Sequence, residues 1–370
     1  MRTVDFPMAK VQVMTAQPDI FSTEDPPGLR GFIDHLDRAG LLKRTTGLVD
    51  WKFEIGRRTR EAKDPTLFED VRGYPGQKVF TNGLRTSACF ALALGLGPEL
   101  PMLEIVAEAE RRLAEPLRPT IIEESPVLEN VREGDTLDLR SLPVPHWNER
   151  DAGRYIGTWH LNISKDPDSG VRNVGVYRMQ LLGANQATVS THPQSDLARH
   201  LAKAEQRDLP LPMAVAIGVP EVAVIAAAGA FPPSQDEYEI AGALGKAPLD
   251  LIRCRDIDLE VPAETEIVIE GFIHPHTRVQ DGPYFDFTGM TNTNPAAFLF
   301  NATRLMFRNA PIFRGTSIGN PGAEDHQLFA FLAALNLVDF SGAELFRRRM
   351  FGAFQSLSKM QAMRGASTTC

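Results

Sequence analysis

The sequence predicts a mixed α/β (α+β) protein, with an α/β domain followed by a β-rich domain. Two observations predict this class. Apolar residues recur with helical period in two segments before residue 115, and extended runs rich in β-branched residues dominate from about residue 154. The chain has 370 residues, which at about 150 residues per domain allows two or three domains. With 43% hydrophobic and 23% charged residues, its composition is globular.

Composition shifts predict four segments along the chain. A polar N-terminal arm at 1–27 ends in a Pro-Pro pair, and an α/β domain follows at 28–145. The Pro-rich passage 142–147 cannot be a central strand and is typical of a boundary. The β-rich domain is expected at 146–335, and a divergent tail with a basic amphipathic stretch at 346–350 occupies 336–370.

Each element is predicted from its own pattern. In the first domain, one helix is expected over the apolar face formed by Leu29, Phe32, Ile33 and Leu36, a short strand at Lys78–Phe80, and a second helix over Met102, Ile105, Val106, Ala109 and Leu113. Gly40 and Pro116 stand where the two helices should end. In the second domain we expect strands over 172–180, 213–219, 222–228, 266–273 and 298–307, and helices over 195–205 and 235–244.

Charge, cysteine and motif content exclude several classes. The 39 basic and 47 acidic residues give a net charge of −8, which disfavours nucleic-acid binding. Three widely spaced cysteines support neither a disulfide framework nor a structural zinc site, and no run of 18 apolar residues predicts a membrane span. We therefore expect a cytoplasmic protein without a membrane partner. The signatures of dinucleotide dehydrogenases, P-loop NTPases, zincins and α/β-hydrolases are absent from the sequence.

Asn173, His192 and Glu237 supply an amide, an imidazole and a carboxylate, which are suitable ligands for Mn²⁺ or Mg²⁺. Residue chemistry alone does not bring them together. His192 equally well precedes a helix that begins near Ser195, and Glu237 equally well is a first-turn acid favoured by the helix dipole.

The run from Asn173 to Arg178 ends in an arginine that is either catalytic or paired to a carboxylate. Gly175 within it permits close approach of a flat ligand to the backbone. Strict alternation along a strand would send Asn173 and Arg178 to opposite faces, so that both serve one site only if the strand is irregular between them.

Asp281 and Asp286 stand five residues apart around a Gly-Pro turn in an otherwise apolar segment. They are interpreted either as paired carboxylates in a pocket, suited to acid/base chemistry, or as turn-capping aspartates. His274 and His276 resemble a metal-ligand pair, but a surface turn is the favoured interpretation because no further ligands stand in register.

In combination, these segments resemble the UbiD family of decarboxylases, which use prenylated FMN. The resemblance covers residues 28–335 and depends on the order of several motifs. They are LRGF at 29–32, FEDVRGYP at 68–75, LPVP at 142–145 leading to GRYI at 153–156, NVGVYR at 173–178, Glu237 with AGAL at 241–244, DLEVPA at 258–263, DGPY at 281–284, and NP at 320–321 before EDH at 324–326.

The resemblance implies a role for each matching residue. The β-rich domain would be a split-barrel flavin-binding domain. Asn173, His192 and Glu237 match the family's ligands for Mn²⁺, and K⁺ is a further implied ion. Gly175, Val176, Arg178 and Thr191 join these three residues in the implied cofactor site. Arg178, Asp281 and Asp286 match the catalytic arginine and the two acids, with Asp286 as the proton donor.

The implied reaction is reversible non-oxidative decarboxylation of an aromatic, heteroaromatic or α,β-unsaturated carboxylic acid. A flavin prenyltransferase would supply the cofactor, and homo-oligomers are common in the family. Three departures from the family pattern stand out: Asp281 replaces the usual Glu, Phe285 replaces a Gly between the acids, and the family's C-terminal part is missing. They motivate the alternative of a catalytically impaired, flavin-binding relative. A metal hydrolase built on His274, His276 and Asp281 is the third hypothesis.

Overall fold

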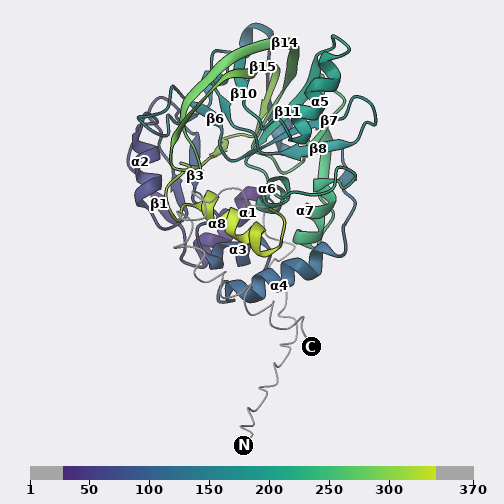
Figure 1. Ribbon diagram of the computed structural model, residues 1–370. Helices are drawn as coiled ribbons and strands as arrows, with labels where there is room; N and C mark the ends of the chain where they lie inside the picture. Colours follow the sequence, from purple (N-terminus) through teal and green to yellow (C-terminus); the bar gives the residue numbers. More distant parts are fainter. Residues whose placement is uncertain (1–27, 339–370) are drawn as a thin grey trace, which may run out of the picture.

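The computed structural model describes residues 28–338, and Figure 1 shows a curled antiparallel sheet above a group of helices. The predicted α/β part followed by a β-rich domain is confirmed. The expected N-terminal arm and the basic stretch at 346–350 lie outside the described residues.

The first part of the chain forms four helices around a small sheet. The helices are α1 (Gly28–Arg38), α2 (Glu54–Glu61), α3 (Ser87–Ala93) and α4 (Met102–Leu113), and the strands are β1 (Lys43–Thr45), β2 (Thr66–Phe68) and β3 (Lys78–Thr81). The fourth strand of this sheet, β16 (Ile312–Arg314), comes from far along the chain and pairs with β3 in parallel. The end of the β-rich part is therefore anchored in the first domain.

The large sheet has seven strands in the order β10-β15-β14-β11-β7-β8, with β5 added on β15. Their bounds are β5 (Asn130–Glu133), β7 (His160–Lys165), β8 (Arg172–Gly175), β10 (Gln186–Val189), β11 (Leu211–Ile217), β14 (Ile267–Phe285) and β15 (Thr291–Phe307). β14 and β15 form a long hairpin with several register shifts, and it arches over the upper half of Figure 1. This curvature turns the sheet into a half-barrel.

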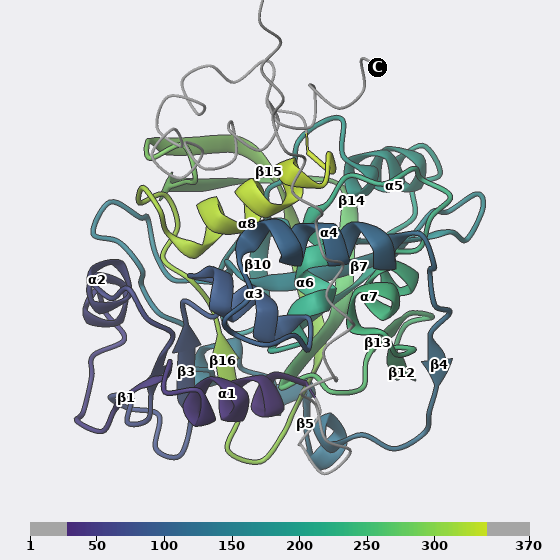
Figure 2. The same cartoon turned by 90° about the horizontal axis from the view of Figure 1, so that it is seen from below.

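Smaller elements complete the structure. The other helices are α5 (Asp196–Glu205), α6 (Glu221–Ala228), α7 (Glu237–Gly245) and α8 (Glu324–Ala334), with 3₁₀ turns at Pro126–Glu129, Gly134–Thr136 and Leu139–Ser141. Two small sheets contain β4 (Thr120–Ile121), β12 (Asp250–Arg253) and β13 (Glu260–Pro262), and β6 (Tyr155–Gly157) with β9 (Met179–Gln180). In Figure 2, α3, α4, α6 and α8 lie close together. No helix in the described residues is long and apolar enough to cross a membrane.

β11 explains how the sheet is buried on both faces. Its residues Met213, Val215 and Ile217 belong to the core cluster inside the half-barrel. The alternate residues Ala214 and Ala216 face the cluster that contains α6 and α7. Small side chains on this second face let the helices pack closely, and burial of both faces produces the continuous apolar run seen in the sequence.

The strand predicted at 222–228 is wrong, because this segment is helix α6. Residues 221–227 are all buried, so the run is apolar on every side and has no period that separates a helix from a strand. Two other predictions need correction. The run 172–180 is interrupted between β8 and β9, and the expected turn at 274–276 is an irregularity within β14.

Candidate active site

A cavity of about 700 Å³ lies where the half-barrel meets helices α6 and α8. Its wall is formed by residues 157–159, 175–178 and 190–193, by the β14–β15 turn region, and by side chains of both helices. The lining is mainly apolar with a few polar groups, and the volume lies in the range of about 300–1,000 Å³ that is usual for cofactor and small-molecule sites.

Arg178 is placed at this wall by the break between β8 and β9. Its Nε donates a 2.7 Å hydrogen bond to Oδ1 of Asp281, and its Nη2 lies 2.6 Å from the same oxygen in an ion pair. Asp281 is fully buried, and its Oδ2 accepts a hydrogen bond of 2.7 Å from the Thr188 hydroxyl. The guanidinium also lies 5.2 Å from the centre of the Tyr284 ring. Arg178 is thus both paired to a carboxylate and in contact with the cavity.

Asp286 lines the same cavity at the end of β14 and is 6% exposed. Its Oδ1 accepts hydrogen bonds from the backbone N–H of Thr288, at 2.9 Å, and from the Thr288 hydroxyl. Its Oδ2 receives only a long contact of 3.4 Å from Asn292. Oδ2 is therefore the oxygen with the greater capacity to carry a proton toward a ligand.

Asn173 and Glu237 meet beside this cavity, at a second one of about 380 Å³. Oε2 of Glu237 accepts a 3.1 Å hydrogen bond from the N–H of Val174, which fixes the carboxylate next to Asn173. Burial raises the pKa of Glu237 to about 7, and the described residues provide no ion pair for it. Asn173 is buried, and its amide oxygen is a suitable ligand for a divalent cation. A bound cation would neutralise this carboxylate.

His192 stands at the wall of the larger cavity rather than the smaller one, with its side chain exposed. Its Nδ1 accepts a 3.2 Å hydrogen bond from the N–H of Gln194, in the loop before Ser195 caps α5. Both sequence interpretations of this residue remain compatible with its position. Among residues 28–338, no three His, Cys, Asp or Glu side chains cluster closely enough for a metal site.

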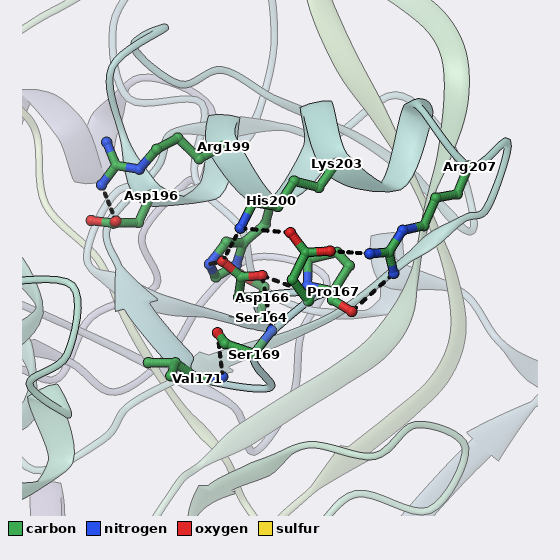
Figure 3. A network of polar contacts seen from close by, with 11 residues as sticks. Ser164, Asp166, Pro167, Ser169, Val171, Asp196, Arg199, His200, Lys203 and Arg207 are labelled. Carbon is green, nitrogen blue, oxygen red and sulfur yellow. Dashed lines mark hydrogen bonds and ion pairs between the residues drawn. The ribbon is translucent and has the colours of Figure 1, made fainter.

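The far wall of the smaller cavity is a polar network between β7 and α5, shown in Figure 3. Lys203 donates to Asp166 at 2.6 Å, and Nδ1 of His200 lies 3.0 Å from the Ser164 hydroxyl. Burial lowers the pKa of His200. Since its charges are paired internally, this network supports the position of α5 beneath the His192 loop.

Gly175, Val176 and Thr191 line the larger cavity together with Arg178 and His192. A Cβ atom at position 175 would lie 2.6 Å from the Tyr177 ring, so only glycine fits there. His274, His276 and Asp281 are not brought together. His276 is exposed and contacts Asp208, whereas Asp281 is buried against Arg178. This arrangement gives the metal-hydrolase hypothesis no support.

Two further acids escaped the sequence analysis. Asp325 lines the cavity from the first turn of α8; its Oδ2 accepts a 3.1 Å hydrogen bond from the N–H of Gly319, and its Oδ1 is buried without a partner. Asp151 lies behind the segment that joins Asp281 to Asp286, and it bonds to the N–H of Phe285. Burial raises the pKa of Asp325, and that of Asp151 to about 7. The only sequence signal was the position of both acids inside or next to family motifs.

Comparison with protein families identifies this architecture. Residues 120–321 match the 3-octaprenyl-4-hydroxybenzoate carboxy-lyase Rift-related domain, called UbiD, and residues 33–109 match the N-terminal domain of the same enzymes. The chain belongs to the UbiD family of carboxy-lyases.

Two relatives of this UbiD family member are named as decarboxylases. It is 35% identical to a phenolic acid decarboxylase of Streptomyces sp. (strain D7), over 80% of this chain and 65% of that protein. It is 33% identical to the pyrrole-2-carboxylic acid decarboxylase of Pseudomonas aeruginosa, over 84% of this chain and 65% of that protein. The chain thus spans slightly less than two thirds of the length of these relatives.

Solved structures have the same fold. Vanillic acid decarboxylase of Sedimentibacter hydroxybenzoicus in its closed form matches with a TM-score of 0.79 and 31% identity, over 82% of this chain and 67% of that chain. An evolved dimeric form of the UbiD-class enzyme HmfF from Pelotomaculum thermopropionicum, in complex with prFMN, matches with a TM-score of 0.77 and 31% identity. That match covers 83% of this chain and 71% of that chain.

Proposed function

We propose that this UbiD family member catalyses reversible, non-oxidative decarboxylation of an aromatic, heteroaromatic or α,β-unsaturated carboxylic acid. Prenylated FMN and a divalent metal, Mn²⁺, would be its cofactors, and K⁺ would be a further ion. The observation that carries the proposal is the Arg178–Asp281 pair at the wall of a mainly apolar cavity that Asp286 also lines. The names of the relatives support the substrate class.

The residues present fit the proposed cofactors. Asn173 offers a buried amide oxygen and Glu237 a largely buried carboxylate without an ion pair among the described residues, and His192 follows at the adjoining wall. These side chains would hold the metal. Gly175, Val176 and Thr191, which line the larger cavity, would border the flat ring. When bound, the modified flavin supplies an electron sink for the carbon that loses CO₂.

Arg178 would orient the substrate carboxylate, because it is the cation at the cavity wall and Asp281 fixes its guanidinium from behind. CO₂ departs with both oxygens of the substrate carboxylate. The electron pair of the broken C–C bond stays on the substrate carbon. The O–H bond at Oδ2 of Asp286 would break as its proton forms the new C–H bond, and the carboxylate that is left would take up the next proton from solvent between turnovers. The apolar walls exclude water that would otherwise compete for the position of the acid.

The alternative of a catalytically impaired relative gains little from two of the three sequence departures. Although Asp281 is one methylene shorter than Glu, it still reaches Arg178 at 2.6 Å. Phe285 does not line the cavity and instead packs near Arg150 and Gly319. Neither substitution therefore fills or disconnects the site.

Co-expression with a flavin prenyltransferase tests the proposal. We expect mass spectrometry of the released ligand to detect prenylated FMN, and the loaded protein to release CO₂ from a member of a broad panel of aromatic and acrylic acids. In D₂O, the vinyl or ring hydrogen of the product should exchange. Bound cofactor without exchange or CO₂ release would favour the impaired relative, and absence of flavin would contradict the proposal.

A further inference from the structure

The segment that carries Asp281 and the cavity residue Asp286 is held from behind by the loop that follows Trp147. The N–H of Ala152 donates to the carbonyl of Pro283 at 2.7 Å. The N–H of Phe285 donates to Oδ1 of Asp151 at 2.8 Å. These bonds fix the backbone at the two positions on either side of Tyr284, immediately before Asp286.

Asp151 is built into this position rather than lying on the surface. It is 7% exposed, and its Oδ2 accepts a 3.1 Å hydrogen bond from the N–H of Asn148. Its own carbonyl oxygen lies 3.0 Å from Nε2 of His146. Within residues 28–338 it forms no salt bridge, so backbone N–H groups are the direct partners of its carboxylate.

The backbone at Gly319 also approaches this segment closely. A Cβ atom at Gly319 would lie 2.2 Å from the carbonyl oxygen of Asp286 and 2.9 Å from the Phe285 ring. The backbone around Asp286 is therefore held both by the Asp151 bond and by the close approach of Gly319. A displacement near 1 Å at such a position costs about a hundredfold in rate.

We propose that Asp151 is a positioning residue of this site, whose ionised carboxylate holds the Phe285 N–H and thereby fixes Asp286 against the cavity. Its catalytic part rests on the proposed function. The structural part, a carboxylate-dependent fixation of the segment, does not.

This role makes the fixation sensitive to pH. Burial raises the pKa of Asp151 to about 7. The charged and titratable groups that face it are Arg60 and Arg178, which favour the ionised form, and Tyr155 and Tyr284, which are neutral at this pH. His146, whose pKa is lowered by burial, contacts Asp151 at its backbone carbonyl oxygen and not at its carboxylate. A protonated carboxyl is the weaker acceptor, so the Phe285 bond should loosen below neutrality.

Amide hydrogen exchange of the full chain tests the structural part without any activity. We expect the Phe285 amide, resolved by fragmentation, to lose protection by about ten- to a hundredfold between pH 8.5 and 5.5 after correction for intrinsic exchange, the range for one charged hydrogen bond. Asp151→Asn should remove this dependence and Asp151→Glu should retain part of it. Unchanged protection of the wild-type amide across this range would overturn the proposal, even if no variant folded.

Glu270 provides a matched control. Like Asp151, it is a buried carboxylate with raised pKa that accepts backbone N–H groups; it lies on β14 and is bonded by Arg255 and Asp256 at 2.8 and 2.6 Å. Glu270→Gln should leave Phe285 protection unchanged. In the cofactor-loaded enzyme, Asp151→Asn should lower kcat by about a hundredfold with little change in KM. Loss of Phe285 protection in Asp151→Asn with unchanged kcat would overturn the catalytic part alone; absence of activity in the wild type would count only against the proposed function.

Discussion

Arg178 and Asp281 form a salt bridge of 2.6 Å between residues 103 positions apart, with the arginine side chain 16% exposed and the aspartate fully buried. The pair has one end in the protein interior and the other at the cavity. Asp281 also accepts a hydrogen bond from the hydroxyl of Thr188, which lies on β10. This second bond further fixes the position of the carboxylate. Arg178 can therefore contact a ligand without losing its anchor.

We expect Arg178→Ala to lower the free energy of unfolding by about 3–5 kcal/mol, because it leaves the Asp281 charge buried without its partner. Replacing both residues, as Arg178→Met with Asp281→Leu, should recover most of this loss, since the buried charge is then removed too. Neither variant should decarboxylate. Urea unfolding of the wild type, the single variant and the double variant measures these differences. Full stability of the single Arg178→Ala variant would show that Asp281 does not depend on the arginine.

Asp286→Asn should affect catalysis without affecting the fold. Asparagine keeps the shape and can still accept the N–H of Thr288, but it cannot deliver the proton, so kcat should fall by about 10²–10⁴-fold. Thermal unfolding and cofactor content should match those of the wild type. Asp258→Asn is the control, since that side chain is 91% exposed. A variant at position 286 with normal turnover would assign protonation to another group.

The chemistry of the candidate site could be predicted because ordered motifs carry it, and the family resemblance also implies the Arg178–Asp281 ion pair that the structure shows. Spacing alone does not indicate that these two residues touch. Asn173 and Glu237 meet only because a helix that begins at Glu237 directs its first side chain at the N–H of Val174. Each contact depends on how distant segments pack.

The predictions that were wrong or incomplete have local physical reasons. Residues 222–228 are uniformly apolar, and a buried helix and a buried strand have the same composition. Asp151 was not recognised because its partners are backbone N–H groups, which leave no pattern in the sequence. The extent of β14 was underestimated because it continues through Pro275 and Pro283, residues that ordinarily argue against a strand.

Glu237→Gln should weaken binding of Mn²⁺ to the purified protein by about 10- to 100-fold or more, since it removes the one anionic ligand of the candidate set. Equilibrium dialysis with metal analysis measures the affinity. Glu239→Gln, two residues along the same helix and partly exposed, is the matched control and should bind normally. Equal affinities in both variants would contradict the assignment of Glu237 as a ligand.

Arg314 is expected to be essential for stability rather than for chemistry. It is 1% exposed and pairs with Glu221 at 2.7 Å and with Glu324 at 2.6 Å, which connects β16 to α6 and α8. Arg314→Met leaves two buried carboxylates without a cation and should cost at least about 3–5 kcal/mol. Because both helices line the cavity, cofactor content should fall with stability. Urea unfolding that matches the wild type would contradict this role.

Ionisation of Asp151 should fix the geometry of the site but lower the free energy of unfolding. Its pKa is raised to about 7 in the folded chain, from 3.8 as its ordinary value, because burial disfavours the charge. The folded state therefore holds this proton more tightly than the unfolded state. The contribution of Asp151 to stability is fully present below pH 3.8 and is lost as the pH rises to about 7.

The difference in unfolding free energy between wild type and Asp151→Asn should therefore decrease as the pH rises from 4.5 to 7.5, by at most about 1.4 kcal/mol per pH unit. Taking the difference removes the contribution of Glu237, which titrates in the same range in both proteins. Activity should change in the opposite direction, rising as Asp151 ionises. Chemical denaturation and kcat measured across this range test both expectations. A stability difference that is constant with pH would mean that Asp151 keeps its ordinary pKa in the folded chain. Parallel trends in stability and activity would contradict the expectation that ionised Asp151 destabilises the fold.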